Sequence, residues 1–296
     1  MSWCGLLNVD KPMGMTSRQV VDHVQKLVRP DKAGHAGTLD PLATGVLIVC
    51  VGTATRLITR IQQGRKRYVG RFLLGKHSDT DDTDGEVFDG GDWSGVTRQS
   101  LEQTLPGFLG TIQQTPPRIS AVKVAGHRAY KLARRGEVVE LQPRPVEVFS
   151  LQISRFEPPE FELEIECGSG TYVRSIGRDM GERLGCGAVM SALRRTAIGR
   201  FAVADAVPLG SLNATSLLDV LMTPQAAVAE LPQRGLDSAE VVRVRQGRPI
   251  PWGFIPDADC HGEVTLVDSA NTMIGIALAD PVQQQLFPKL ILSALQ

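Results

Sequence analysis

The sequence predicts a fold that combines helices with β-strands and ends in a small all-β unit. Three observations predict it: an amphipathic helical pattern near the N-terminus, apolar or alternating segments of strand length in the middle, and short β patterns after residue 237. The chain has 296 residues, of which 42% are hydrophobic and 22% charged. These values are typical of a globular protein with one large or two modest domains.

The first elements follow from apolar spacing. Thr16 or Ser17 can cap a helix that runs to about Arg29, because its apolar residues recur at helical spacing: Val20, Val21, Val24, Leu27 and Val28. A buried strand is expected at Gly45–Val51, a short helix at Thr53–Gln63, and a second strand at Tyr68–Leu74. Cys50, in the first of these strands, is read as a small core residue.

The second half of the chain begins with an alternating segment. Within 158–167, Phe161, Leu163, Ile165 and Cys167 alternate with glutamates, which predicts a half-exposed strand. The chain then passes through a Gly-Ser-Gly turn into Tyr172–Leu184, where strand gives way to helix. We expect a helical linker over roughly Ser211–Ala229, and short strands in the tail at VVRVRQGRPI, GEVTLVD, TMIGIALA and KLILS.

Composition and spacing argue against several classes of protein. No apolar run approaches the roughly 20 residues of a membrane helix, and the N-terminus lacks the pattern of a secretory signal. The 5 cysteines are scattered without a CxxC pair, which fits a reducing, cytoplasmic location. The acidic HSDTDDTDGE misses the register of a calcium loop by one position, so an acidic turn between strands is favoured. Neither a metal nor a nucleotide cofactor is expected, since ligand and phosphate-loop motifs are missing.

The formal net charge of zero hides blocks of one sign. Residues 1–78 carry a net +8, 79–114 a net −7, 115–200 a net +4 and 201–296 a net −5. The stretch 118–135 holds six basic residues and no acidic one. Such blocks make local electric fields that suit nucleic acid, although each can also be a solvated face of an ordinary protein.

One segment combines features of a reactive site. In AGHAGTLDPLATGVL, Asp40 lies in a glycine-flanked loop directly before the most hydrophobic strand of the chain. A carboxylate at the end of a core strand could act as a nucleophile or a base. From spacing alone, a plain turn or cap is the favoured interpretation of Asp40, because Asp followed by Pro commonly opens a turn.

This segment resembles the catalytic motif of the TruB family of pseudouridine synthases, the bacterial tRNA pseudouridine-55 synthases. Further segments resemble motifs of the family and follow in family order: GLLNVDKPMGMTS, KRY, SDTDDTDG, GSGTYVRS and MSALRR. A weaker match extends to the C-terminal end. The resemblance therefore rests on several motifs in sequence rather than on one.

The resemblance implies an α+β fold with a mixed, largely antiparallel central sheet, flanking helices and a small all-β PUA-like C-terminal domain. It places the catalytic domain at residues 1–210, a helical linker at 211–236 and the PUA-like domain at 237–296. Residues 115–145 resemble the basic RNA-clamping insertion of the bacterial enzymes. This implies a cytoplasmic monomer that acts on the T-stem loop of tRNA without a guide RNA.

The implied reaction turns a uridine into pseudouridine without a cofactor. By resemblance, Asp40 is the nucleophile, and attack on C1′ or on C6 both remain open. Arg174 is the cation that keeps this carboxylate ionised, with a planar fork able to form two hydrogen bonds to it. Tyr68 stacks on the flipped base and can assist a proton transfer.

Other residues are implied to bind the substrate. His35 stacks within the opened T-loop, and Tyr172 forms a second pocket wall. Lys11 and Leu193 are neighbours of the pocket, with a turn lysine and a plain core leucine as the alternatives. A further set of basic residues consists of Arg128, Lys131 and Arg134. If the segment that carries them is helical, they form a stripe along one side of the helix that is able to follow a phosphate backbone.

A second function is compatible with the same motifs, namely an RNA-binding, tRNA-folding factor whose catalysis is dispensable. The acidic balance of the linker and tail leaves the role of the tail open. Either its RNA contacts are confined to Arg243, Arg245 and Arg248, or the domain is structural.

Overall fold

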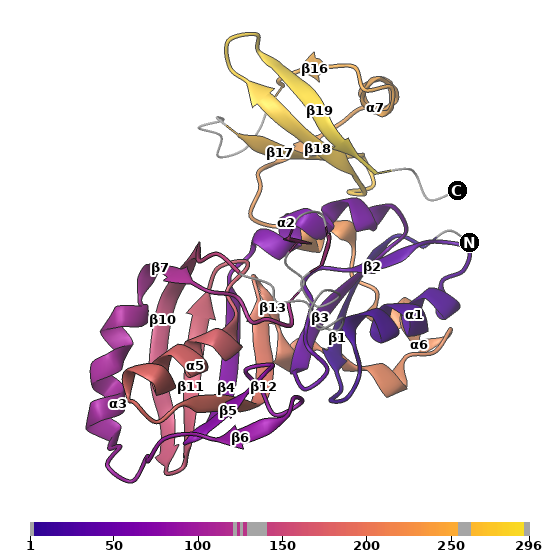
Figure 1. Cartoon of the computed structure of the whole chain (residues 1–296). Coiled ribbons are helices and arrows are strands. Elements are labelled where there is room, and N and C mark those ends of the chain that lie inside the picture. Colours follow the sequence, from indigo (N-terminus) through magenta and orange to yellow (C-terminus); the bar gives the residue numbers. More distant parts are fainter. Residues whose placement is uncertain (1–2, 121–122, 125–126, 129–140, 254–261, 293–296) are drawn as a thin grey trace.

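The computed structural model describes residues 3–120, 123–124, 127–128, 141–253 and 262–292. A ten-stranded mixed sheet forms the body, and a separate five-stranded sheet carries the C-terminal part of the chain (Figure 1). Most neighbouring strands of the large sheet are antiparallel, with two parallel pairings, β1–β14 and β3–β12. The expected α+β fold with a small all-β tail is therefore confirmed, except for one tail helix described below.

The first half of the large sheet comes mainly from the N-terminal part of the chain. Its strand order is β14–β1–β3, with β2 also paired to β3. The bounds are β1 (Gly5–Lys11), α1 (Ser17–Leu27), β2 (Ala33–His35), β3 (Thr44–Val51), a 3₁₀ turn η1 (Gly52–Leu57), α2 (Ile58–Gln63) and β14 (Val207–Pro208). The strand expected at Gly45–Val51 is confirmed, and the short helix expected at Thr53–Gln63 is present as the 3₁₀ turn η1 followed by α2.

Helix α1 begins where the sequence predicts. The Thr16 hydroxyl accepts a hydrogen bond from the Gln19 amide, and the Gln19 side chain accepts one from the Thr16 amide. This reciprocal capping satisfies amides at the start of the helix that would otherwise lack partners. The buried face of α1 packs on β1 and β3 through Val20, Val21 and Val24.

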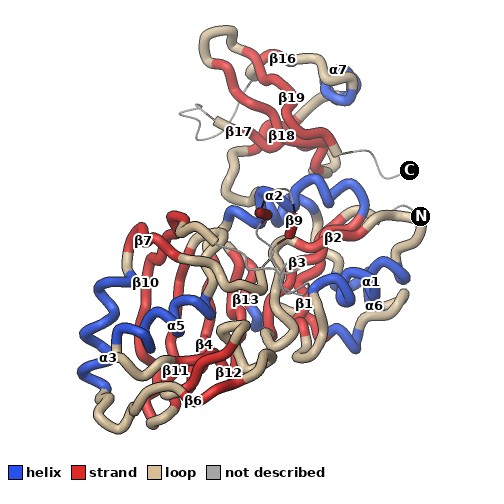
Figure 2. Tube along the Cα trace, viewed as in Figure 1, coloured by secondary structure: helices blue, strands red, loops and turns tan. Residues whose placement is uncertain are grey.

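The second half of the sheet has the order β12–β4–β11–β10–β7, with β13 paired to β12. The bounds of its elements are β4 (Lys66–Leu74), β5 (Lys76–Ser78), β6 (Val87–Asp89), α3 (Arg98–Thr104), a 3₁₀ turn η2 (Leu105–Phe108), β7 (Gly110–Gln114), β10 (Arg144–Glu157), β11 (Glu160–Cys167), α5 (Val173–Arg183), β12 (Ala188–Ile198) and β13 (Phe201–Ala202). Figure 2 shows α5 lying across this half.

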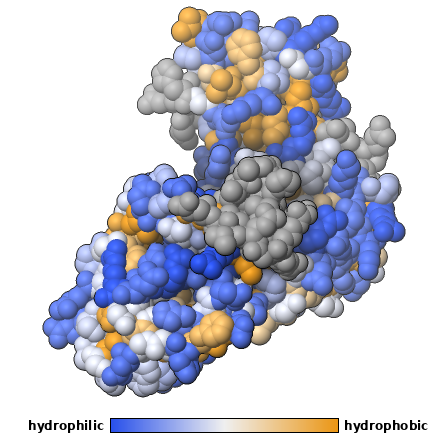
Figure 3. Space-filling model, viewed as in Figure 1, coloured by the Kyte–Doolittle hydropathy of each residue, from blue (hydrophilic) through white to orange (hydrophobic). Residues whose placement is uncertain are grey.

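The alternation in β11 works as predicted. Phe161, Leu163, Ile165 and Cys167 are buried, and they join the cluster beneath α5 that includes Ile176 and Met180. The glutamates on the other face point toward solvent, where Glu162 pairs with Arg71 and Glu166 with Arg65. The side seen in Figure 3, which carries α5, is largely hydrophilic with scattered hydrophobic patches.

The helical linker expected over roughly Ser211–Ala229 is helical only in part. The segment forms a short helix α6 (Ser216–Val220) and a 3₁₀ turn η5 (Pro224–Ala227). Between them, Met222 exchanges two backbone hydrogen bonds of 2.9 Å with Leu6 of β1. An extended residue paired to the sheet interrupts the helix, and Pro224, which has no amide hydrogen, starts the following turn.

The tail sheet has the order β15–β17–β18–β19–β16. Its elements are β15 (Gln233–Gly235), α7 (Ser238–Arg245), β16 (Ile250–Pro251), β17 (Glu263–Val267), β18 (Met273–Asp280) and β19 (Gln285–Ile291). The strand expected at VVRVR is wrong, because α7 occupies it. Asp237 caps this helix by accepting from the Glu240 amide at 2.8 Å, while Glu240 caps in return.

The tail docks on the body through apolar and charged contacts. Leu57 and Ile61 share a buried cluster with Met273, Ile276 and Leu292. Arg60 of α2 forms ion pairs with Glu230 and with Glu263 of β17. Two of the acidic residues of the linker and tail, Glu230 and Glu263, therefore bind the body of the protein. In the described part of the chain, no helix has the length and apolarity needed to span a membrane.

Candidate active site

A pocket opens at the boundary between the two halves of the large sheet. It encloses about 130 Å³ and brings together five of the sequence-predicted residues. They come from four places in the chain: the loop before β3, β4, the start of α5 and β12. The five are Asp40, Tyr68, Tyr172, Arg174 and Leu193.

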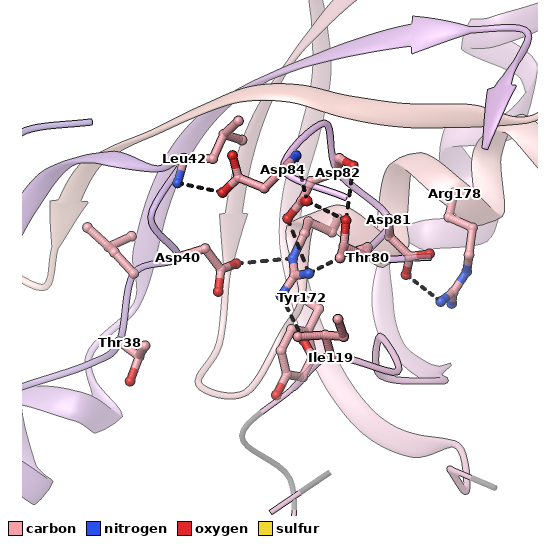
Figure 4. A network of polar contacts seen from close by, with 12 residues as sticks. Thr38, Asp40, Leu42, Thr80, Asp81, Asp82, Asp84, Ile119, Tyr172 and Arg178 are labelled. Carbon is pink, nitrogen blue, oxygen red and sulfur yellow. Dashed lines mark hydrogen bonds and ion pairs between the residues drawn. The ribbon is translucent and has the colours of Figure 1, made fainter. Parts of the chain in front are cut away.

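The Asp40 carboxylate and the Arg174 guanidinium form an ion pair in this pocket. Asp40 Oδ2 lies 3.0 Å from Arg174 Nε, and the two side chains are 35% and 5% exposed (Figure 4). Asp40 thus faces the pocket while the arginine is buried behind it. A neighbouring cation favours the ionised form of a carboxylate, which is the form able to act as a nucleophile.

The expected two-bond fork on Asp40 is not what the structure contains. Only Nε of Arg174 faces Asp40, whereas Nη1 donates to the carbonyl of Thr80 and lies 3.2 Å from Asp82 Oδ2. Nη2 donates to the carbonyl of Ile119 at 3.3 Å. The guanidinium therefore contacts three segments at once: the Asp40 loop, the acidic turn at Thr80 and Asp82, and the backbone at Ile119.

Asp82 is a site residue that the sequence analysis did not single out. It is 3% exposed, and its pKa is raised by burial, although a hydrogen bond from Thr80 and the charge of Arg174 oppose the rise. Thr80 Oγ1 donates to Asp82 Oδ1 at 2.6 Å. The predicted acidic turn between β5 and β6 is present.

The loop that carries Asp40 is held from several sides. Ser17 Oγ accepts from the Leu39 amide at 2.8 Å and lies 3.0 Å from the Leu39 carbonyl. Lys11 Nζ donates to the Pro41 carbonyl at 3.3 Å and to the carbonyls of Pro12 and Met15 in the turn after β1. Asp84 accepts from the Leu42 amide at 3.2 Å. Asp40 therefore lies on a fixed backbone.

Lys11 is fully buried at the end of β1. Burial lowers the pKa of its ammonium to about 8, and the nearby Asp40 charge opposes this shift. Its nitrogen contacts backbone carbonyls rather than the Asp40 carboxylate. Lys11 does not line the pocket; it holds the turn after β1 and braces the Asp40 loop through Pro41.

Aromatic side chains form walls of the pocket. Burial raises the pKa of the Tyr68 phenol, so this group is neutral at physiological pH. The backbone of Tyr172 is fixed by Gln114, which accepts from its amide at 2.8 Å and donates to its carbonyl at 3.0 Å. The Arg144 guanidinium lies 5.1 Å from the Tyr172 ring centroid. Flat walls of this kind suit a single planar ring.

The remaining predicted residues do not line the pocket. His35 ends β2, where burial lowers the pKa of its imidazole and Nδ1 is buried without a hydrogen-bond partner. Arg128 lies in a two-residue strand, β9 (His127–Arg128), paired with β8 (Lys123–Val124), rather than in a helix. Lys131 and Arg134 lie outside the described residues.

Across the residues that the structure describes, no three His, Cys, Asp or Glu side chains are grouped as metal ligands would be. The pocket instead offers a carboxylate beside a buried cation, two aromatic rings and an apolar wall. Such a set can attack an electrophilic carbon on, or attached to, a flat ring.

Comparison with known proteins gives consistent matches. Residues 25–173 match the N-terminal domain of the TruB family pseudouridylate synthases, and residues 174–225 match the tRNA pseudouridylate synthase B C-terminal domain. A tRNA pseudouridine synthase B of Synechococcus sp. is 40% identical over 297 residues, covering 98% of both chains. That of Synechococcus elongatus is 41% identical and covers 100% of both.

Among solved structures, a chain from an H/ACA RNP bound to a substrate RNA containing 2'-deoxyuridine has a similar fold. Its TM-score is 0.73 at 22% identity, and the match covers 98% of this chain and 85% of that one. At this level of identity the likeness concerns the fold alone.

Proposed function

The chain belongs to the TruB family of tRNA pseudouridine synthases, and on that basis we propose that it isomerises uridine 55 in the T-loop of tRNA, with Asp40 as the nucleophile. The family makes it an isomerase. The position of the uridine and the role of each side chain are the proposal.

In the proposed reaction the uracil leaves C1′ through N1, turns within the pocket and rejoins C1′ through C5. C5 loses its proton and N1 finishes with one, so the reaction is an isomerisation without oxidation. The Asp40 carboxylate forms a transient bond to the nucleotide and is released at the end.

The observation that carries the proposal is the ion pair between Asp40 and Arg174 at the wall of a small aromatic-lined pocket. The pair places a carboxylate beside a buried guanidinium where a base would enter. A uridine in a folded loop must leave its stack to reach that place, and stacking on Tyr68 and Tyr172 offsets part of the cost.

We propose that phosphates of the T-stem loop are held by Arg128, Lys131 and Arg134, and that His35 stacks in the opened loop. The enzyme acts as a monomer and needs no guide RNA. We divide the chain into a catalytic domain at 1–210, which includes the basic clamp at about 115–145, a helical linker at 211–236 and a PUA-like domain at 237–296. The ends of β14 at Pro208 and the start of the tail sheet at Gln233 support this division.

The test is incubation of the purified protein with an unmodified tRNA transcript, followed by pseudouridine mapping. We expect modification at position 55 and none in a matched transcript that carries cytidine there. Pseudouridine at another position, or none at all, would overturn the proposal.

A further inference from the structure

The two halves of the large sheet meet at a narrow joint. β3 and β12 pair in parallel through two residue pairs, Arg194 with Thr44 and Arg195 with Gly45. Gly45 has a φ of +97°, and a Cβ there would lie 2.2 Å from the Arg195 carbonyl oxygen. Only glycine allows the strands to approach in this way.

This joint separates the parts of the proposed active site. Asp40 is carried by the loop between β2 and β3, on the first half, whereas Tyr68 and Arg174 belong to the second half. Any shift between β3 and β12 would therefore change the distance from Asp40 to its partners. Two residue pairs fix that distance only in part, even together with the hydrogen bond from the Leu42 amide to Asp84 across the same boundary.

The side chain of Arg195 crosses the joint. Its Nε donates to the Val46 carbonyl of β3 at 2.7 Å. Nη2 donates to the Gly37 carbonyl at 3.0 Å, and Nη1 to the Thr38 carbonyl at 3.4 Å. Both of these carbonyls precede Asp40 by three residues or fewer. One planar group thus ties β12 to β3 and to the Asp40 loop.

Arg195 is 1% exposed, and in the described part of the chain no carboxylate forms an ion pair with it. Burying a charge without a counter-ion costs free energy, so stability alone is a poor explanation for this residue. The neighbouring Arg194 differs, since it is 43% exposed and pairs with Asp10 at 2.8 Å. The two arginines therefore cross the same joint in different environments.

We propose that Arg195 is a positioning residue for the isomerisation, which holds the Asp40 loop at a fixed distance from the strands that carry Tyr68 and Leu193. Arg195 is the direct cross-strand neighbour of Tyr68, so its guanidinium links both sides of the pocket from behind. Its charge also opposes the rise in the pKa of the Tyr68 phenol that burial causes. The inference rests on the proposed role of Asp40.

The experiment compares Arg195→Lys with the matched variant Arg194→Lys. A lysine keeps the charge of Arg195 but cannot donate to three carbonyls from one plane. For each variant we would measure the thermal midpoint, the Kd for unmodified tRNA and the single-turnover rate at saturating tRNA. We expect Arg195→Lys to bind tRNA normally while its rate falls by about tenfold or more, since a misplacement of about 1 Å can cost on the order of 100-fold. Arg194→Lys should keep its rate.

A folded Arg195→Lys variant with the wild-type rate would overturn the inference, and so would an equal loss of rate in both lysine variants. If Arg195→Lys does not fold, Gly37→Ala decides. Gly37 has a φ of +107°, which a side chain strains, so alanine displaces the carbonyl that Arg195 holds while the joint stays intact. A wild-type rate in Gly37→Ala then refutes the positioning role. Asp40→Asn, measured alongside, separates failure of the nucleophile assignment from failure of this inference.

Discussion

Replacing Lys11 with methionine should change how the stability of the protein depends on pH. The Lys11 ammonium is fully buried, and burial lowers its pKa from 10.5 to about 8. Below pH 8 the group is charged in the folded and the unfolded chain. Between pH 8 and 10.5 the unfolded chain binds the proton and the folded chain does not, so the free energy of unfolding rises with pH.

The size of this effect follows from the shift. A gap of about 2.5 pH units at about 1.36 kcal/mol per unit corresponds to roughly 3 kcal/mol. Methionine cannot titrate, so the free energy of unfolding of the wild type minus that of Lys11→Met should increase by up to roughly this amount across the window. Taking this difference cancels the titration of all other groups.

The assay is urea unfolding of both proteins at several pH values from 7 to 10.5, with the free energy of unfolding extrapolated to water. Lys26→Met, at an exposed lysine of α1, is the matched control and should give a difference that does not change with pH. If the difference for Lys11→Met also does not change with pH, the conclusion that burial lowers the pKa of Lys11 is refuted.

Three further predictions concern the pocket, the joint and the RNA. Arg174→Lys keeps the charge beside Asp40, but a lysine cannot also donate to the carbonyls of Thr80 and Ile119. Turnover should fall by more than about tenfold, which is about 1.4 kcal/mol of barrier. An unimpaired variant would show that the hydrogen bonds to these two carbonyls are unimportant. Gly45→Ala forces a methyl group against Arg195 at a positive φ and should lower the free energy of unfolding by about 1–3 kcal/mol or more, which thermal or urea unfolding would detect and an unchanged midpoint would contradict. Changing the three residues of the proposed clamp, Arg128, Lys131 and Arg134, to glutamine should reduce the slope of log affinity against log salt concentration by about 2 to 3. An unchanged slope would show that these side chains contact solvent rather than phosphates.

Much of the fold could be predicted because its signals are local. Helix α1 has a capping residue and a regular apolar face, and β11 alternates with a period of two. The prediction failed at α7, where the β-branched residues of VVRVR favoured a strand. Asp237 and Glu240, which cap each other, were the local signal of a helix start, but the strand-like pattern of the following residues was given more weight.

Only those residues of the pocket that stand in sequence motifs could be predicted. Asp40, Tyr68 and Arg174 stand in recognisable segments, and the structure brings them to one pocket. Asp82 and Arg195 could not be assigned, because their roles depend on contacts between distant parts of the chain. Arg174 meets Thr80 across 94 residues, and Arg195 reaches Gly37 across 158. No local spacing encodes such a contact.

The role of Asp40 is the central claim, and the variant Asp40→Asn tests it most directly. Asparagine keeps the shape of the side chain but removes the negative oxygen beside Arg174. We predict that single-turnover formation of pseudouridine at position 55 disappears while the Kd for tRNA is unchanged. Residual turnover within about tenfold of the wild type, which is only about 1.4 kcal/mol of barrier, would contradict the assignment of Asp40 as the nucleophile.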